Sequence, residues 1–406
     1  MPIDAPRVAA PTQAVHPRTH DARVRTERDA TACPHRPPCP GCPRFGEPGI
    51  APSRLAALDS LARAHGLPGV AVVSGATRGF RHRARLAIRG RPGAPKIGLF
   101  QAGTHRVVTV PECSVHHPAI NRAASVVRRA LVDARIPPYV EGSHSGLARH
   151  LQVVVERRSQ AVQVVLVGNC AGAGPLAAGL DLIRARLGAE LHSLWFNANV
   201  ARTNTILGPE FVHWCGPPAV VERFGGADVH YPPGAFGQNN LDIAGRIVEQ
   251  VRALVPVGSV VTEFYAGVGA IGLSLLERVR SLRLNEVAPQ SLQGLSLGIE
   301  RLAAHDRAKL EVVPGPAGTA TAALAGADVV IVDPPRKGLD AELLAELCSR
   351  VPARLVYVSC GLESFLHDAA KLTSPGAYAL TALQAFNLLP YTDHVETVAC
   401  FDRMTG

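Results

Sequence analysis

From about residue 240 onward, continuous apolar runs alternate with segments of helical periodicity. Runs that are apolar at every position are typical of strands covered on both faces, as in a parallel sheet between layers of helices. The pattern therefore predicts an α/β, Rossmann-like domain over residues 231–406. Its expected strands are Ser259–Tyr265, Leu282–Val287, Ala327–Asp333, Arg354–Ser359 and Val395–Phe401.

Between about residues 33 and 225 the apolar runs are shorter and are separated by glycine and proline turns. A helix is expected at Ser53–Ala64, with Ser53 as its N-cap. We expect an α+β domain over residues 33–230, with strands that include Arg83–Ile88, Leu151–Glu156 and Ala161–Val167. Residues 1–32 show no apolar periodicity and are predicted to form a disordered tail.

The composition is that of a globular protein: 47% of the 406 residues are hydrophobic and 18% are charged. No apolar run approaches the roughly 18 residues of a membrane helix, and the N-terminus lacks the apolar core of a signal peptide. We therefore expect a cytoplasmic protein that does not associate with a membrane. Its formal net charge of +9 favours a polyanionic partner such as nucleic acid.

Nine cysteines, an odd number, in a chain without a secretion signal argue for metal binding or catalysis rather than disulfides. The spacing C-x5-C-x2-C in a proline-rich loop suits a metal, with the ligands Cys33, Cys39 and Cys42. The expected fourth ligand is Cys113, although its neighbours His116 and His117 also allow a zinc site. By coordination chemistry alone, zinc and a 4Fe-4S cluster both stay open.

The segment EFYAGVGAIGL leads from a strand through Gly267 and Gly269 into an expected helix. Glycines there let the backbone approach a ligand closely. At the end of the next strand, Glu286 can bind the two hydroxyls of a ribose. These features predict a nucleoside-cofactor site, and because Gly272 completes G-x-G-x-x-G, NAD is an alternative to S-adenosylmethionine.

A fourth strand ends in VIVDPPRKGL, where Asp333 precedes two prolines. Such a turn forms a rigid edge at the place where open α/β sheets bind ligands. Nucleobase methyltransferases use acid-Pro-Pro turns to seat a planar ring, whereas dehydrogenases do not need one. Enzymes that methylate amino groups in DNA have a related turn with an aromatic residue after the prolines. In this chain Arg336 follows the prolines instead.

Methylation of a ring carbon requires a covalent nucleophile, and Cys360 in YVSCGLES ends the next strand at the same sheet edge. A thiolate that adds to carbon 6 of uracil converts the ring to an enolate. A base must later remove the carbon 5 proton, and Glu396 in YTDHVETVACF is the candidate. A buried structural cysteine and a surface salt bridge are the alternative interpretations.

Taken together, FGQNN (residues 236–240), FYAGVG, VDPPRKGL, YVSC and LLPYTDHVE resemble the RNA uracil-5-methyltransferases, which form 5-methyluridine. The resemblance spans about residues 33–406. It implies that Cys360 is the nucleophile and Glu396 the base, with Arg336 and His394 as lesser candidates. It also implies S-adenosylmethionine binding by Gln238, Tyr265, Gly267, Gly269, Glu286 and Asp333.

In cluster-bearing members of this family, the C-x5-C-x2-C thiols and a distant cysteine hold a 4Fe-4S cluster. The resemblance therefore favours a 4Fe-4S cluster over zinc, and it favours 23S rRNA as the substrate. We expect neither an N-terminal RNA-binding β-barrel nor an obligate protein partner. A transfer RNA enzyme and a noncatalytic RNA-binding protein with this fold are the alternatives. Three departures motivate the latter: Gly361-Leu362 for Asn-Pro, Asn387 for Asp, and no acid in Val312–Gly318.

Five arginines near the cysteines share odd positions and are expected to point to one face of a strand: Arg81, Arg83, Arg85, Arg89 and Arg91. Phosphate contacts are the expected use of this face, and a merely solvated face is the alternative. The opposite face, with Ala84, Leu86 and Ile88, is expected to be half-buried.

Overall fold

Alternate residues of the strands in the second half of the chain pack into two apolar cores, one on each face of an eight-stranded sheet. In β14, Val329 and Ile331 contribute to one core, and Val330 and Val332 to the other. This computed structural model describes residues 33–374 and 376–404, so the predicted tail lies outside the described residues. The fold below is that of the unit Pro34–Gly406.

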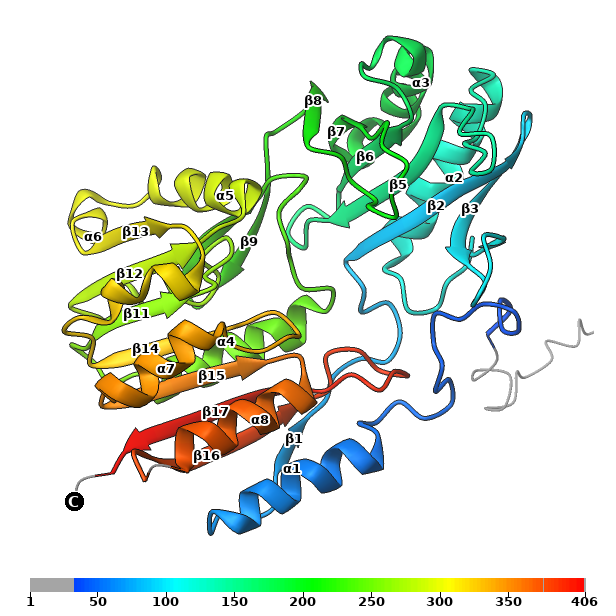
Figure 1. Ribbon diagram of the computed structural model, residues 1–406. Helices are drawn as coiled ribbons and strands as arrows, with labels where there is room; N and C mark the ends of the chain where they lie inside the picture. Colours follow the sequence, from blue (N-terminus) through cyan, green and yellow to red (C-terminus); the bar gives the residue numbers. More distant parts are fainter. Residues whose placement is uncertain (1–32, 375, 405–406) are drawn as a thin grey trace, which may run out of the picture. The chain divides into compact units, whose positions relative to one another are not determined.

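The strand order of this sheet is β1-β16-β17-β15-β14-β11-β12-β13 (Figure 1). All pairs are parallel except those of β17, which runs antiparallel to both β15 and β16. The five expected strands are confirmed, whereas β1, β13 and β16 were not among them. The bounds are β1 Ala71–Val73, β11 Val260–Phe264, β12 Ser281–Glu286, β13 Leu310–Pro314, β14 Val329–Val332, β15 Arg354–Ser359, β16 Tyr378–Phe386 and β17 Glu396–Arg403.

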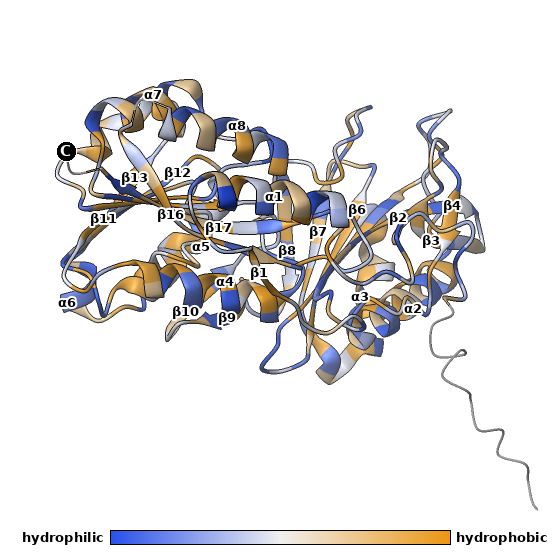
Figure 2. Cartoon of the chain, turned by 90° about the horizontal axis from the view of Figure 1, so that it is seen from below, coloured by the Kyte–Doolittle hydropathy of each residue, from blue (hydrophilic) through white to orange (hydrophobic). Residues whose placement is uncertain are grey.

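Helices cover both faces of this sheet. The helices α4 (Leu241–Leu254) and α5 (Pro289–Ile299) pack into one core, and α7 (Ala341–Arg350) and α8 (Leu362–Thr373) into the other. Figure 2 shows hydrophobic and hydrophilic sides on α7 and α8, as amphipathic helices have. The short helix α6 (Ala304–Arg307) precedes β13.

A second sheet has seven strands in the order β4-β3-β2-β5-β6-β7-β8. Helices α2 (Pro118–Asp133) and α3 (Ala177–Leu187) share its apolar core. The three strands expected in this region are confirmed. The bounds are β2 Arg83–Arg91, β3 Ala94–Phe100, β4 Val107–Thr109, β5 Ala148–Val155, β6 Val162–Gly168, β7 Leu191–Ala198 and β8 Glu210–Cys215, and a hairpin of β9 Val220–Phe224 and β10 Ala227–Tyr231 follows.

Helix α1 (Pro52–Ala64) is present, but the predicted N-cap Ser53 is wrong. The N-cap is Ala51, and Pro52 occupies the first turn, where its fixed φ and missing N–H suit a helix start without a side-chain cap. Leu58 of α1 is buried in a core of the eight-stranded sheet, and β1 pairs with β16. This sheet therefore includes a strand from outside residues 231–406.

The expected row of phosphate-binding arginines on β2 is wrong for Arg83 and Arg89, which are only 8% and 9% exposed. The Arg83 guanidinium donates to the Ala235 carbonyl, and that of Arg89 donates to the Arg149 carbonyl and pairs with Glu141. Other chain segments cover this face, which a strand pattern cannot reveal. The apolar face is confirmed, because Ala84, Leu86 and Ile88 are buried.

No helix in the described part of the chain is long and apolar enough to span a membrane.

Candidate active site

The glycine loop after β11 meets the acid at the end of β12. The Gly267 N–H donates to Glu286 Oε2 at 2.7 Å, and the N–H groups of Val287 and Ala288 donate to Glu286 Oε1. Gly267 and Gly269 both have positive φ, 61° and 83°. A Cβ on Gly267 would meet nothing within 4 Å, so the loop is open there, as a ligand-binding loop requires.

The other two glycines of G-x-G-x-x-G serve packing. A Cβ on Gly269 would lie 2.7 Å from the Leu295 side chain, and one on Gly272 would lie 2.3 Å from Glu263 Oε2. The loop continues into a 3₁₀ turn at Leu273–Leu275 rather than the helix that we expected.

Tyr265, directly after β11, also has a positive φ of 61°, which is uncommon for a residue with a Cβ. Its hydroxyl donates to Asp340 Oδ2 and accepts from the Asp340 N–H at 3.1 Å. Burial raises the pKa of Tyr265, so the hydroxyl stays protonated. Sequence reasoning missed Asp340, which lies in a turn and belongs to no recognisable motif.

The structure brings Asp333, Cys360 and Glu396 together. Asp333 follows β14, Cys360 follows β15, and Glu396 begins β17. Ser359 is paired with Thr397 in the antiparallel ladder, so Cys360 and Glu396 come next at the same sheet edge. The three candidates therefore share one location, as the sequence predicted.

Burial raises the pKa values of these three groups, and repulsion by neighbouring acids adds to the shifts of Glu396 and Cys360. Burial raises the pKa of Asp333 to about 7. Burial, reinforced by the Asp333 charge and opposed by Arg336, raises the pKa of Glu396 to about 8. Burial, together with Glu396 and Asp333, raises the pKa of the Cys360 thiol to about 11. Such perturbed groups in a cleft are typical of catalytic sites.

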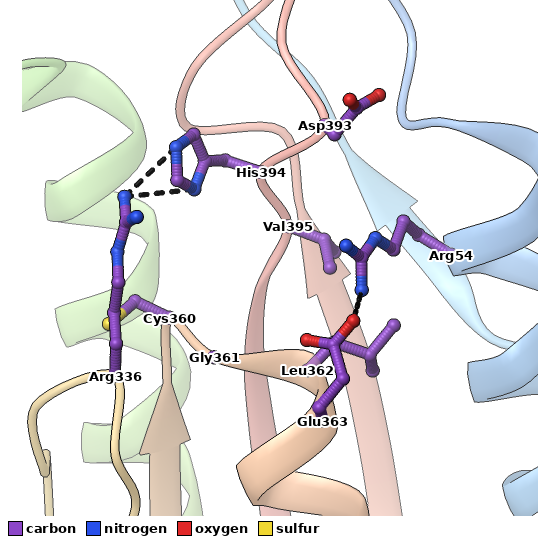
Figure 3. Close-up of a pocket in the computed structure, with 9 residues that line it drawn as sticks. All are labelled: Arg54, Arg336, Cys360, Gly361, Leu362, Glu363, Asp393, His394 and Val395. Carbon is purple, nitrogen blue, oxygen red and sulfur yellow. Dashed lines mark hydrogen bonds and ion pairs between the residues drawn. The ribbon is translucent and has the colours of Figure 1, made fainter.

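A cavity of about 200 Å³ opens beside Cys360 (Figure 3). The Arg336 guanidinium donates to His394 Nε2 at 2.9 Å, and Arg54 of α1 forms an ion pair with Glu363. Arg54 had no sequence signal, because its helix lies far from the motifs in the chain. The lining residues are Arg54, Arg336, Cys360, Gly361, Leu362, Glu363, Asp393, His394 and Val395.

Gln238, the remaining predicted cofactor ligand, lines a different and smaller cavity. Its neighbours there include Arg83 and Tyr231.

The candidate metal ligands Cys42 and Cys113 lie near one cation, Arg81, and Cys39 lies near Cys113. Burial lowers the pKa of Arg81, and negative charge on Cys42 and Cys113 opposes that shift. Burial raises the pKa of Cys113, which the neighbouring Cys39 reinforces and backbone N–H donors oppose. Within residues 33–374 and 376–404, no group of three or more His, Cys, Asp or Glu side chains is arranged to hold a metal ion.

Gly361, the first departure from the family pattern, is required by local packing. A Cβ at this position would lie 2.7 Å from both the Arg336 carbonyl oxygen and Ser364 Oγ. Ser364 Oγ in turn donates to the Arg336 carbonyl. The glycine therefore lets the turn that carries Arg336 contact the nucleophile's own turn.

The other two departures also have specific contacts. The Asn387 side chain donates from Nδ2 to the Pro48 carbonyl at 2.6 Å, a bond that an ionised aspartate cannot make. In the loop after β13, a Cβ on Gly318 would lie 3.0 Å from Glu342 Oε2. A carboxylate from α7 thus lies where the loop itself supplies none.

The fold is Rossmann-like, and its candidate nucleophile and candidate base meet at one edge of the sheet. The model of the family described as tRNA (Uracil-5-)-methyltransferase matches residues 324–404. A sequence of Protochlamydia amoebophila, named an uncharacterized RNA methyltransferase, is 34% identical and covers 93% of this chain and 98% of its own length. One of Halalkalibacterium halodurans with the same description is 29% identical over 78% of this chain and 69% of its own.

Among solved structures, that of Pyrococcus abyssi tRNA (uracil-54, C5)-methyltransferase in complex with S-adenosyl-L-homocysteine is similar, with a TM-score of 0.72 and 24% identity. The similarity covers 86% of this chain and 83% of that one, and it shows that the two folds are alike. The chain belongs to the RNA (uracil-5-)-methyltransferase family, whose members use S-adenosylmethionine.

Replacing Glu396 by glutamine is expected to stabilise the protein above neutral pH. Because the folded pKa is about 8 rather than the usual 4.5, the folded wild type retains a proton that the unfolded chain loses, and its stability falls between these pH values. Urea unfolding should show Glu396→Gln to be more stable by on the order of a few kcal/mol at pH 8.5, with little difference near pH 4.5. The control is Glu249→Gln, a change to an exposed residue, which should not make the free energy of unfolding depend on pH in this way. Equal changes in the free energy of unfolding for the two variants would contradict the buried state of Glu396.

Restoring asparagine at position 361 is expected to harm this protein. The added Cβ must displace the Arg336 turn or Ser364, at a cost of about 1–3 kcal/mol in the free energy of unfolding, and it should lower methyl transfer. Chemical denaturation and an activity assay test this expectation. Gly142→Asn is the control, because a Cβ there meets nothing within 4 Å. A Gly361→Asn variant with unchanged or higher stability and activity would show that the glycine is not needed.

Proposed function

We propose that this chain methylates carbon 5 of a uridine in RNA through a covalent bond between Cys360 Sγ and carbon 6. The observation that carries the proposal is the convergence of the Cys360 thiol with the Asp333 and Glu396 carboxyl groups at one sheet edge. A cavity of about 200 Å³ lies directly beside the thiol. A structural cysteine does not need a pair of buried carboxyl groups next to it.

The Cys360 thiolate adds to carbon 6, and the electron pair of the ring double bond moves into an enolate. Carbon 5 then takes the methyl group of S-adenosylmethionine, and S-adenosylhomocysteine leaves with the electron pair of the broken carbon–sulfur bond. Glu396 removes the proton from carbon 5, the double bond re-forms, and the bond between Sγ and carbon 6 breaks. Glu396 must be ionised to accept this proton, which its pKa of about 8 permits only in part at neutral pH.

Cations around Cys360 support its ionisation. Arg336 opposes the rise in the pKa of both Cys360 and Glu396. The sulfonium of the methyl donor adds a further positive charge when it binds, which lowers the pKa of nearby acids. Glu286, Gly267 and Tyr265 border the open glycine loop and are the proposed cofactor contacts, with Gln238 and Gly269 as outer members of that set.

The cavity beside Cys360 is the proposed seat of the target uridine, which must leave its stack to reach the thiol. Arg54 and Arg336 supply positive charge on opposite sides of this cavity for the phosphates. The family resemblance favours 23S rRNA as the substrate. Transfer RNA is the second candidate, because the matching family model and the Pyrococcus structure are both named for it.

A 4Fe-4S cluster held by Cys33, Cys39, Cys42 and Cys113 is the proposed metal centre. Three observations support it for the last three ligands: their sulfur donor set, the proximity of Cys42 and Cys113 to Arg81 and of Cys39 to Cys113, and the backbone N–H groups that donate to Cys113. Zinc is the alternative, favoured by His116, whose buried Nδ1 has no hydrogen-bond partner. Methyl transfer to an activated uracil needs no electron, so the centre has a structural or RNA-positioning role.

The nucleophile is tested with RNA that lacks the modification and with labelled S-adenosylmethionine. Wild type should produce 5-methyluridine, and Cys360→Ala should produce none, because the enolate cannot form without the thiolate. RNA with 5-fluorouridine at the target should trap a covalent complex with wild type alone, since fluorine cannot leave as a proton. Cys348→Ala, a change to a partly buried thiol on α7, is the control that should retain activity.

The size class of the labelled RNA distinguishes ribosomal from transfer RNA. Absence of product from an anaerobically purified and folded wild type would refute the proposed activity. An adduct that persists in Cys360→Ala would assign the nucleophile to another residue.

The metal centre is tested by elemental analysis of protein purified without oxygen. Iron and acid-labile sulfide in equal amounts, with broad visible absorption, are the expected result, and Cys39→Ser, Cys42→Ser and Cys113→Ser should each lose them. Cys215→Ser should retain both, because this cysteine lies on β8. Bound zinc without sulfide would favour the alternative, and a protein that holds neither metal would contradict the proposed centre.

A further inference from the structure

Residues 39–48, which include Cys39 and Cys42, are called the cysteine segment below. Its residues 44–48 lie against the hairpin loop 387–395, which joins β16 to β17. The Phe45 ring contacts the Tyr391 ring, with a centroid distance of 5.1 Å. The Asn387 side chain donates to the Pro48 carbonyl. More than three hundred residues separate these two segments in the sequence, so the contact is a product of the tertiary fold.

Arg44 makes most of the polar contacts between the two segments. Its backbone N–H donates to the Tyr391 carbonyl at 2.9 Å, and Nη1 donates to the Thr392 carbonyl at 3.3 Å. Its Nε lies 3.7 Å from Asp393 Oδ1. The Arg44 side chain is only 15% exposed, whereas that of Asp393 is 63% exposed. The bonds to the backbone carbonyls are therefore better shielded from water than the ion pair, and they are worth more.

The same guanidinium is fixed from its own side. The bond from Nη1 to the Gly49 carbonyl, at 2.9 Å, holds the guanidinium in this position. Nη2 also pairs with Glu47 at 3.0 Å, but that carboxylate is 72% exposed, so this pair adds little. A side chain held in this way positions its partners instead of following them.

The contacted loop needs such support. Tyr391 has a positive φ of 67°, a conformation that residues with a Cβ adopt only when their surroundings impose it. The loop itself carries His394, which lines the cavity, and Glu396, which begins β17, follows the loop directly. A displacement of the loop would therefore move the carboxylate that must reach the carbon 5 proton.

We propose that Arg44 is a positioning residue for Glu396, and that the cysteine segment acts on catalysis through it. This inference rests on the proposed function. Cys42 lies two residues before Arg44, and the Phe45 N–H donates to the Cys42 carbonyl. Order in the cysteine segment is thereby transmitted to the base, so the segment contributes to proton removal and not to RNA binding alone.

The test separates the two halves of the reaction. Arg44→Ala should slow removal of the carbon 5 proton but not attack by Cys360 or methyl transfer, because the contacts of Arg44 outside its own segment are with loop 387–395, which leads into Glu396. We expect kcat to fall roughly tenfold to a hundredfold with an unchanged KM for RNA. With ordinary RNA, the methylated covalent complex should accumulate in a single turnover and be visible on a denaturing gel, as in Glu396→Gln.

Glu47→Ala is the matched control. It removes an exposed ion-pair partner of Arg44 and leaves the contacts with loop 387–395, so kcat and the covalent complex should match wild type. Arg44→Lys keeps the charge but loses the forked geometry, and it should give an intermediate result. Asn387→Ala removes a second anchor of the same loop and should show the same accumulation, which tests the inference even when Arg44→Ala does not fold.

A purely structural role of Arg44 predicts that adduct formation and turnover decline together, and that result would overturn the inference. The failure of the proposed function looks different, because wild type itself would then form no Cys360-dependent adduct with 5-fluorouridine RNA. A wild type that forms this adduct, together with anchor variants that show no accumulation, rejects the positioning role alone.

Discussion

The insertion of one antiparallel strand into a parallel sheet is the constraint on which the candidate site depends. The ends of β14 and β15 carry Asp333 and Cys360, and parallel strands place such ends at one sheet edge. β17 runs the other way, so its first residue, Glu396, arrives at that same edge. Had β17 been parallel, its beginning and Glu396 would lie at the opposite edge, away from the thiol. Three hydrogen-bonded neighbours thus deliver an acid, a nucleophile and a base to one place.

This convergence has an electrostatic cost that substrate binding can offset. Burial disfavours the ionised forms of the two carboxyl groups and the thiol, and repulsion between the acids adds to this cost for Glu396 and Cys360, as their raised pKa values show. Arg336 compensates for part of it, and it is itself held by His394 and by the close approach of its turn to Gly361. A cationic methyl donor is the kind of ligand that such a site favours. Without ligands, the site therefore favours the protonated forms of Asp333, Cys360 and Glu396. The positive charge of a bound methyl donor favours their ionisation.

The sequence predicted the parts of this site that depend on strand ends. Asp333, Cys360 and Glu396 each border a clear apolar run, so their shared edge followed from the strand pattern. Arg54, Asp340 and Arg44 had no comparable signal, because their roles come from contacts between segments distant in the chain. Arg83 and Arg89 show the opposite error: period-two alternation identifies a second face of the strand but not the segment that covers it. The orientation of β17 was equally invisible, since antiparallel and parallel strands share one apolar pattern.

The contacts of Gly361 and Asn387 explain how this chain accommodates two departures from the family motif. Gly361 replaces a larger residue, and the space is taken by the Arg336 carbonyl and Ser364 Oγ, which also bond to each other. Asn387 replaces an acid, and its amide donates to Pro48 of the cysteine segment. Both changes therefore tighten contacts around the candidate nucleophile and the loop before the candidate base. Each of these departures thus has a packing contact of its own, so neither by itself is an argument for a noncatalytic protein.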